Sequence, residues 1–273
     1  MSTSKPVAPK QTALVTGASS GIGAVYADRL ARRGYDLILV ARDQGRLDAL
    51  AERLRAETGV TVQVVRADLT APADVRRIEA VLQGDAAITL LINNAGAAYF
   101  APFGAADPDR LEALVQLNAV ALTRLANAAV GAFAGRGAGT LVNIGSVMGL
   151  APELKSPVYG ATKAYVLALT QGLNEELAGS GVRFQAVLPG ATRTEIWDRS
   201  GRGIENVPEG MLMDADAMVD AALAGLDQGE LVTIPSLPDA ADWRAFEAAR
   251  VKLLPNLSRP HPAARYGVGV EAV

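Results

Sequence analysis

Three side chains suited to proton transfer lie close together in the middle of the sequence. Tyr159 and Lys163 are four residues apart, and Ser146 lies thirteen residues before Tyr159. In a helix, residues i and i+4 share one face, so the Lys163 ammonium can lie beside the Tyr159 hydroxyl. A free phenol has a pKa near ~10, and a neighbouring cation lowers it toward the range that a base needs. The spacing predicts an acid/base pair, although Tyr-x-x-x-Lys alone also occurs on solvated helix surfaces.

The composition excludes several other kinds of catalytic centre. The chain of 273 residues contains no cysteine, and its single histidine, His261, lies between two prolines. Thiolate nucleophiles, disulfides and cysteine metal sites are therefore excluded, and we expect neither a Ser-His-Asp triad nor a bound metal. The net charge is -3 and the basic residues form no stripe, which argues against a nucleic-acid partner. We expect a small-molecule substrate instead.

The residue pattern indicates one main domain. Hydrophobic residues make up 50% of the chain, which is enough for one sizeable core. The first residues contain no apolar segment like that of a signal peptide, and no run of about 18 apolar residues occurs, so we expect a cytoplasmic protein without a membrane partner. We divide the chain into an N-terminal tail (1–9), the main domain (10–236) and a helical extension of that domain (237–273).

Short β-rich runs alternate with alanine- and leucine-rich stretches, which is typical of parallel strands joined by crossover helices. Strands are predicted at 12–16, 37–41, 61–66, 88–92, 140–144, 183–188 and 231–234. Helices are predicted at 22–33, 44–58, 72–82, 108–133, 159–178 and 239–254. The fold class is therefore α/β, with a doubly wound parallel sheet of seven strands and helices on both faces. In such sheets ligands bind outside the carboxyl ends of the strands, where the strand order reverses.

A glycine-rich loop, Thr-Gly-Ala-Ser-Ser-Gly-Ile-Gly, joins the first predicted strand to the first helix. The first glycine permits a tight turn, the second a close approach to a pyrophosphate, and the third close packing of the helix on the sheet. The helix N-terminus adds unpaired N–H groups and a partial positive charge. A turn without a ligand is the alternative. The expected cofactor contacts in this loop are Gly17, Ser19, Ser20, Gly21, Ile22 and Gly23.

The residues after the second and third strands bear on the choice of cofactor. Arg42 follows the small Ala41 where an acidic residue would favour NAD(H), and Arg46 lies one turn further on. An arginine here suits the 2'-phosphate of NADP(H), so we predict that NADP(H) is preferred over NAD(H). A solvated Arg42 whose charge is reduced by Asp43 is the alternative. Two residues after the third strand are expected at the adenine edge, with a helix cap as the competing role of the aspartate: Asp68 and Leu69.

Taken together, these motifs resemble the short-chain dehydrogenase/reductase family in its single-domain form, which has a Rossmann fold. The resemblance covers roughly residues 10–236 and rests on the glycine loop, Asn93-Asn94-Ala95-Gly96, Asn118, Ser146, Tyr159, Lys163 and Pro189-Gly190. It implies hydride transfer between a nicotinamide cofactor and a carbonyl or alcohol carbon. It further implies that Tyr159 is the general acid or base, that Ser146 hydrogen-bonds the substrate oxygen, and that Lys163 contacts the nicotinamide ribose and lowers the Tyr159 pKa.

The resemblance also assigns roles outside this trio. Asn118 would hold a water that relays protons to Lys163, whereas a purely structural bond to the backbone is the alternative. Family members commonly pair the helices at 108–133 and 159–178, which implies a homodimer or homotetramer. Ser20 stands where many NADP-using members carry a basic residue. The remaining implied cofactor contacts are Asn94, Ala95, Gly96, Tyr159, Lys163, Pro189, Gly190, Thr192 and Thr194.

The residues around these motifs predict an apolar substrate. The expected pocket residues are Tyr99, Phe100, Met148, Leu150, Ile196, Trp197, Met211 and Met213. They favour an NADPH-dependent reductase of a mostly apolar ketone or aldehyde, although Arg193, Arg199 and Arg202 leave an anionic group open. The alternatives are an NAD-dependent alcohol dehydrogenase, a 3-oxoacyl carrier-protein reductase and a non-catalytic protein that senses its cofactor.

Overall fold

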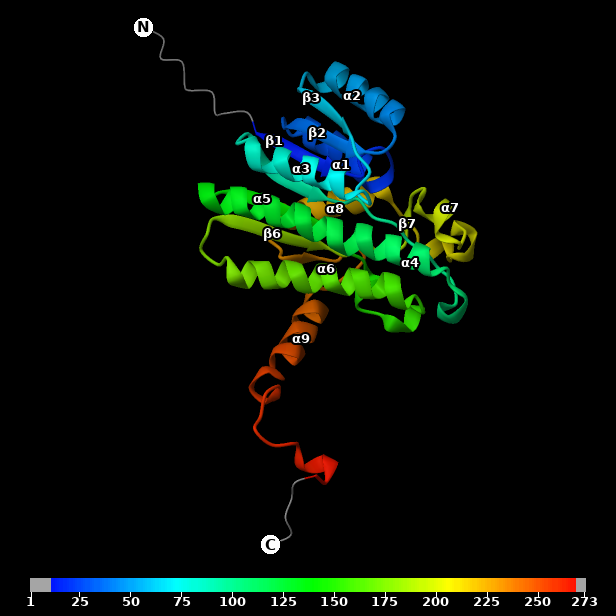
Figure 1. Cartoon of the computed structure of the whole chain (residues 1–273), viewed down its shortest axis with the longest axis vertical. Coiled ribbons are helices and arrows are strands. Elements are labelled where there is room, and N and C mark those ends of the chain that lie inside the picture. The colour runs from blue at the N-terminus through cyan, green and yellow to red at the C-terminus, as the bar shows by residue number, and fades with distance from the viewer. Residues whose placement is uncertain (1–10, 269–273) are drawn as a thin grey trace. The chain divides into compact units, whose positions relative to one another are not determined.

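The structure, a computed structural model, describes residues 11–268 and contains one large parallel sheet. Its strands are β1 (Thr12–Thr16), β2 (Asp36–Ala41), β3 (Val62–Arg66), β4 (Ile88–Asn93), β5 (Gly139–Ile144), β6 (Val182–Val187) and β9 (Val232–Thr233). They lie in the order β3-β2-β1-β4-β5-β6-β9, so the order reverses between β1 and β4 (Figure 1). The predicted fold class is confirmed, and each predicted strand agrees with its observed bounds to within one residue.

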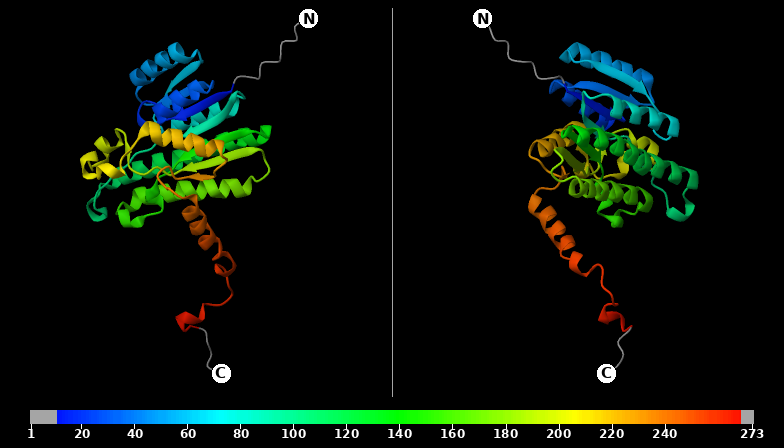
Figure 2. Two further views of the ribbon diagram at one scale, coloured as in Figure 1. Left: turned by 180° about the vertical axis from the view of Figure 1, so that it is seen from behind. Right: turned by 60° about the vertical axis from the view of Figure 1, so that its left-hand side comes forward.

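Helices cover both faces of the sheet because alternate strand residues point to opposite sides. Figure 1 shows α3 (Pro72–Gly84), α5 (Leu122–Arg136) and α6 (Pro157–Glu176) on the near face. The reverse view in Figure 2 brings forward α1 (Gly21–Arg32) and α8 (Ala215–Asp227), which share the far core with α2 (Gln44–Thr58). Val15 of β1 packs into this far core, whereas its neighbour Leu14 packs into the near one.

The segment between β6 and β9 contains structure that the sequence analysis did not predict. Two short strands, β7 (Thr192–Arg193) and β8 (Met213–Asp214), form a separate parallel pair. Between them lies α7 (Ile196–Ser200), and α8 follows β8. The helical spacing of the buried residues Met218, Val219, Ala222, Leu223 and Leu226 was a usable signal for α8.

The long helix predicted at 108–133 is interrupted by a π-helical segment. It consists of α4 (Pro108–Val115), the π-helix η2 (Gln116–Ala121) and α5. Among the described residues this is the one helix, Pro108–Arg136, that is long and apolar enough to cross a membrane, and half of its most apolar window is buried. Buried α5 residues pack into the near core against β1 and β5, as expected for a core helix.

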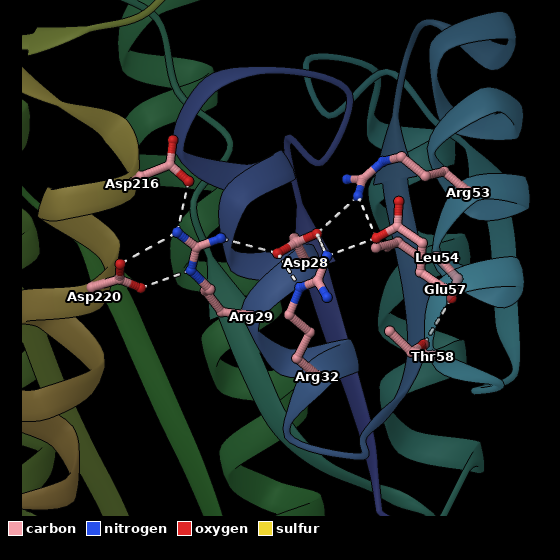
Figure 3. A network of polar contacts seen from close by, with 9 residues as sticks. All are labelled: Asp28, Arg29, Arg32, Arg53, Leu54, Glu57, Thr58, Asp216 and Asp220. Atoms are coloured by element: carbon pink, nitrogen blue, oxygen red, sulfur yellow. Dashed lines mark hydrogen bonds and ion pairs between the residues drawn. The ribbon is translucent and has the colours of Figure 1, made fainter.

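A buried carboxylate joins the helices of the far face (Figure 3). Asp28 of α1 accepts hydrogen bonds from Arg29, Arg32 and Arg53 at 3.0, 3.0 and 2.9 Å. Burial alone would raise the pKa of Asp28, but the bonds from Arg32, Arg53 and Arg29 outweigh it and lower the pKa to about 2. Arg29 also binds Asp220 of α8 at 2.7 Å. The network therefore ties α1 to both α2 and α8.

The chain divides into two compact units after Pro235. In the second unit, α9 (Ala240–Val251) begins at Asp239, whose side chain accepts a 2.7 Å hydrogen bond from the Ala241 amide. Trp243 and Phe246 stack within this helix with their ring centroids 5.3 Å apart. None of the residues of α9 is buried.

Candidate active site

The predicted motifs meet at the carboxyl ends of the central strands. The glycine loop follows β1, Asn93 and Asn94 end and follow β4, Ser146 follows β5, and Pro189 follows β6. Because β1 pairs with β2 on one side and with β4 on the other, the loop lies where the strand order reverses. This is the place at which doubly wound sheets bind ligands.

Backbone geometry requires the glycines of the loop. Gly17 and Gly21 have φ angles of +67° and +52°, a region that side chains disfavour. A Cβ atom at Gly23 would lie 2.2 Å from the Gly17 carbonyl oxygen, which is too close for any other residue. The loop is therefore a tight turn in which the start of α1 packs directly against Gly17, the residue that follows β1.

The N-terminus of α1 is open to an anion. Its N-cap residue, Ser20, makes no side-chain capping hydrogen bond, and its first turn contains no acidic residue. By contrast, Asp43 and Asp107 cap α2 and α4 through their side chains. An uncapped helix end presents free N–H groups and the positive end of the helix dipole. With the glycine turn, it fits the pyrophosphate of a dinucleotide.

Asn94 fixes the glycine loop from the side of β4. Its Nδ2 donates a 2.9 Å hydrogen bond to the Thr16 carbonyl oxygen, and the amides of Asn94 and Ala95 both donate to Thr16 Oγ1 at 2.9 Å. A Cβ atom at Gly17 would lie 2.8 Å from this same Nδ2. The side chain of Asn94 therefore positions the loop. Gly96, two residues further on, is exposed.

Asp68 and Leu69 make structural contacts in the described chain. The Asp68 carboxylate accepts from the amide and hydroxyl of Thr70 at 2.9 and 2.7 Å, which closes a turn before α3. The N-cap of α3 is Ala71, so Asp68 is not the cap. The Leu69 side chain is buried in the near core. An adenine contact by Asp68 and Leu69 therefore stays a prediction.

Close packing of two backbones brings Ser146 to α6. Ser146 caps the 3-10 helix η3 (Val147–Gly149), where its Oγ accepts from the Met148 amide at 3.2 Å. A Cβ atom at Gly149 would lie 2.7 Å from the Ala164 amide nitrogen, so the turn packs directly on the helix backbone. This approach brings Ser146 near enough to the Tyr159 hydroxyl to influence its pKa, while Ser146 Oγ itself donates to the Pro189 carbonyl oxygen at 3.4 Å.

Tyr159 is a buried phenol that stays neutral at physiological pH. Burial raises its pKa to about 12, and the hydrogen bond with Ser146 opposes this shift. The sequence predicted a Tyr159 pKa lowered by Lys163, but burial raises this pKa instead. In this state Tyr159 is suited to donate a proton.

Lys163 is a buried ammonium held next to the same site. Its Nζ donates a 2.9 Å hydrogen bond to the Ile144 carbonyl oxygen and lies 5.7 Å from the centroid of the Tyr159 ring. Burial lowers its pKa to about 8, since the charged form loses solvation. A Cβ atom at Gly96 would lie 3.6 Å from this Nζ, so the turn after β4 borders the ammonium.

Asn118 lies in the π-helical segment, and its amide is bound to the turn after β4. Its Oδ1 accepts from the Ala97 amide and its Nδ2 donates to the Ala97 carbonyl oxygen, both at 2.9 Å. The same Nδ2 also donates to Thr162 Oγ1 at 3.2 Å. These bonds use both N–H groups of the Asn118 amide, and its Oδ1 keeps a second lone pair for a further donor. π-Helical turns frequently occur at functional sites.

An aromatic wall, formed by Phe100 and Trp197, borders the Tyr159 ring. Phe100 meets Tyr159 edge to face with centroids 5.8 Å apart, and Trp197 stacks on Phe100 at 6.1 Å. Trp197 is anchored by a 2.8 Å hydrogen bond from Nε1 to the Thr192 carbonyl oxygen. Met148 and Ile196 pack into the same cluster. The structure thus assembles this group of predicted pocket residues around Tyr159.

Other predicted pocket residues have different surroundings. Met211 is 63% exposed, and Met213 contributes to β8 and packs against the far core. The Tyr99 ring is covered by the Arg110 guanidinium, 3.8 Å from its centroid. Arg193 is paired with Glu209 and, at 3.2 Å, with Asp214, so its charge is already balanced.

The segment after β6 lies over the glycine loop. A Cβ atom at Gly21 would lie 3.0 Å from the Thr194 methyl carbon, while Thr192 is buried and bonds the Gly190 carbonyl oxygen at 3.1 Å. The next residue, Glu195, forms an ion pair with Arg46 at 2.6 Å. Sequence reasoning missed this pair because the two residues are 149 positions apart.

Comparisons with known proteins agree with this geometry. The short chain dehydrogenase family model matches residues 11–204. A short-chain dehydrogenase from Sphingobium yanoikuyae, solved in complex with NADPH, is 55% identical with a TM-score of 0.91, covering 94% of this chain and 99% of that one. A bulky-bulky ketone specific alcohol dehydrogenase from Comamonas testosteroni is 50% identical with a TM-score of 0.87 and the same coverage.

A more distant relative acts on a different class of substrate. The very-long-chain 3-oxoacyl-CoA reductase of Bos taurus is 32% identical over 198 residues, which cover 68% of this chain and 63% of that protein. The family match spans the glycine loop, Ser146, Tyr159 and Lys163. With more than half of the sequence matched, the chain is an oxidoreductase that belongs to the short-chain dehydrogenase family.

Proposed function

We propose that the protein is an NADPH-dependent reductase of bulky, mostly apolar ketones or aldehydes. The observation that carries the proposal is the aromatic wall of Phe100 and Trp197 against the buried Tyr159 phenol. Aromatic side chains bury large apolar areas and favour flat, apolar partners. A neutral phenol with a pKa of about 12 suits the reductive direction, in which the carbonyl oxygen needs a proton.

The proposed roles follow from the position of each group. Tyr159 Oη donates a proton to the carbonyl oxygen, and Ser146 Oγ holds that oxygen by a second hydrogen bond. The bound nicotinamide cofactor supplies the hydride. Lys163, whose pKa is about 8, retains most of its positive charge at neutral pH and stabilises the phenolate that proton donation leaves. Asn118 acts as a positioning residue that holds the turn at Ala97 next to Lys163.

The proposed preference for NADPH rests on the end of β2. Ala41 is followed by the exposed Arg42, and Arg46 lies in the first turn of α2. A guanidinium can bind the 2'-phosphate of NADP(H) through two parallel hydrogen bonds. The ribose of NAD(H) has no phosphate at this position. The NADPH bound to the similar Sphingobium yanoikuyae enzyme supports the same choice.

A 3-oxoacyl thioester is the second candidate substrate, because a relative that reduces such a thioester is 32% identical. Arg193 is already paired with Glu209 and Asp214, so its charge is not free to bind an anionic carrier group. The similarity to an enzyme described as specific for bulky ketones favours the apolar substrate.

Initial rates with three carbonyl compounds and both cofactors test the proposal. We expect benzophenone to be reduced with NADPH at a higher kcat/KM than either acetone or acetoacetyl-CoA, and NADPH to be used more efficiently than NADH. A higher kcat/KM for acetoacetyl-CoA would support the thioester alternative. Preference for NADH would refute the cofactor assignment and leave the reaction class intact.

A further inference from the structure

The guanidinium proposed to meet the 2'-phosphate already holds an anion. Arg46 Nη1 binds Glu195 Oε2 at 2.6 Å, and its Nε lies 3.5 Å from Asp43 Oδ2. The hydrogen bond that Arg46 donates to Glu195 raises the pKa of Arg46. The pair joins the first turn of α2 to the segment directly after β7, across 149 residues of sequence.

The same segment touches the glycine loop at a second point. Thr194, the residue before Glu195, places its methyl carbon 3.0 Å from the position that a Cβ atom would take at Gly21. Ile196 and Trp197 follow directly, and Trp197 stacks on Phe100 of the aromatic wall. Four consecutive residues, 194–197, therefore connect Arg46 and the glycine loop to the aromatic wall.

We infer that Glu195 is a specificity-determining residue that competes with the 2'-phosphate of NADP(H) for Arg46. The inference rests on the proposed preference for NADP(H). Binding of the phosphate exchanges one anion for another on the same guanidinium and releases the Glu195 carboxylate to solvent. A cofactor without this phosphate leaves the Arg46–Glu195 pair in place.

The exposure of the pair makes this exchange feasible. The side chains of Arg46 and Glu195 are 46% and 45% exposed, so solvent screens their attraction. Exposed ion pairs contribute little to the free energy of folding. A phosphate carries more negative charge than a carboxylate and can accept two parallel hydrogen bonds from one guanidinium. The carboxylate therefore weakens 2'-phosphate binding without preventing it, and its effect is confined to ligands that carry this phosphate.

Isothermal titration with two cofactor fragments tests the inference without turnover. Adenosine 2',5'-bisphosphate carries the 2'-phosphate, and AMP lacks it. We expect Glu195→Gln to bind the bisphosphate about two- to fivefold more tightly than the wild type, as the loss of a weak surface pair predicts. The affinity for AMP should stay unchanged. Equal changes for both fragments, or no change for the bisphosphate, would overturn the inference.

Two control variants separate a specific effect from a general one. Glu205→Gln removes one negative charge from the segment between β7 and β8. The Glu205 carboxylate accepts a hydrogen bond from Asn206, and the ion-pair partners of Arg46 among the described residues are Asp43 and Glu195. This variant should leave both affinities unchanged. In an Arg46→Ala background, Glu195→Gln should no longer affect the bisphosphate. An undiminished gain in that background would show that Glu195 acts through overall charge and would overturn the inference.

The fragments also distinguish failure of the inference from failure of the proposed function. If the wild type binds the bisphosphate no more tightly than AMP, and Arg42→Ala changes neither affinity, the NADP(H) preference is wrong. If the wild type and Arg42→Ala differ for the bisphosphate alone, the preference stands. An unaltered affinity of Glu195→Gln would then refute only the competition for Arg46. Thermal melting of each variant verifies that it is folded.

Discussion

The Lys163 ammonium donates a hydrogen bond to the carbonyl oxygen of Ile144, the last residue of β5, at 2.9 Å. This bond ties α6 to the strand end from which Ser146 follows, and it holds a charge in a buried position. Burial of the charge destabilises the protonated form, which is why the Lys163 pKa falls to about 8 from the usual 10.5. The same charge supports the chemistry proposed for Tyr159.

Lys163→Met should change how stability depends on pH. Below pH 8, Lys163 is protonated in the folded and unfolded states, so the folded wild type bears the whole cost of the buried charge. Between about 8 and 10.5 the folded state loses its proton first, so wild-type stability rises relative to the variant by about 3 kcal/mol in total. Urea unfolding of both proteins from pH 7 to pH 10.5 measures this difference. Parallel pH curves would contradict the buried charge.

Tyr159→Phe should remove most turnover and leave the fold intact. The phenol is the proposed proton donor, and general acid groups contribute about 10²–10⁴ in rate. Steady-state kinetics with NADPH and a bulky ketone measure the loss. Tyr165→Phe is the matched control, because this hydroxyl lies on the same helix and contacts Thr123 rather than Ser146. A Tyr159→Phe enzyme with more than half of the wild-type activity would refute the proton-donor role.

Asp28→Asn should remove an acid-sensitive part of the stability. The folded-state pKa of Asp28 is lowered to about 2 from 3.8, so its contribution is present above 3.8 and is lost as the pH falls through about 2. We expect the variant to be less stable at pH 7 by at most about 2 kcal/mol, since its arginine partners are partly solvated. Urea unfolding at pH 7 and pH 3 measures this loss, which should shrink at the lower pH.

Asp220→Asn is the control for the same network. Asp220 is 56% exposed, and Arg29 is its one ion-pair partner within residues 11–268, so its loss should cost less than about 1 kcal/mol. Equal losses from Asp28→Asn and Asp220→Asn would show that burial of Asp28 does not strengthen its ion pairs.

The outer faces of α5 and α6 should form a contact between copies of the chain. Val120 of η2 and Tyr165 of α6 are 40% and 41% exposed, and a groove of about 570 Å³ is lined by Ala126, Val130, Leu169 and Leu173 among others. Sedimentation at low micromolar concentration should give a dimer or tetramer mass. Ala168→Glu places a charge on the exposed side of α6 and should shift the mass to the monomer. A wild-type monomer at that concentration would rule out this contact.

Local sequence was sufficient to predict the strands, most of the helices and the loop glycines. Short apolar runs that are buried on both faces mark the strands without reference to their partners, and the turn at Gly17 needs a positive φ wherever it occurs. The π-helical turn at Asn118 is different, because it is accompanied by hydrogen bonds to Ala97 that no helical pattern reveals. A helix was therefore predicted there, but its interruption was not.

The sequence by itself determined which residues could do the chemistry, because residue type and spacing along a strand or helix are local properties. Only the tertiary structure decided how that chemistry is tuned. Burial, set by the packing of α6 against η3 and β5, raises the pKa of Tyr159 and lowers that of Lys163. The meeting of Arg46 with Glu195 likewise depends on how distant segments fold back over the glycine loop. Solvation and long-range contacts belong to the folded chain, and no sequence spacing encodes them directly.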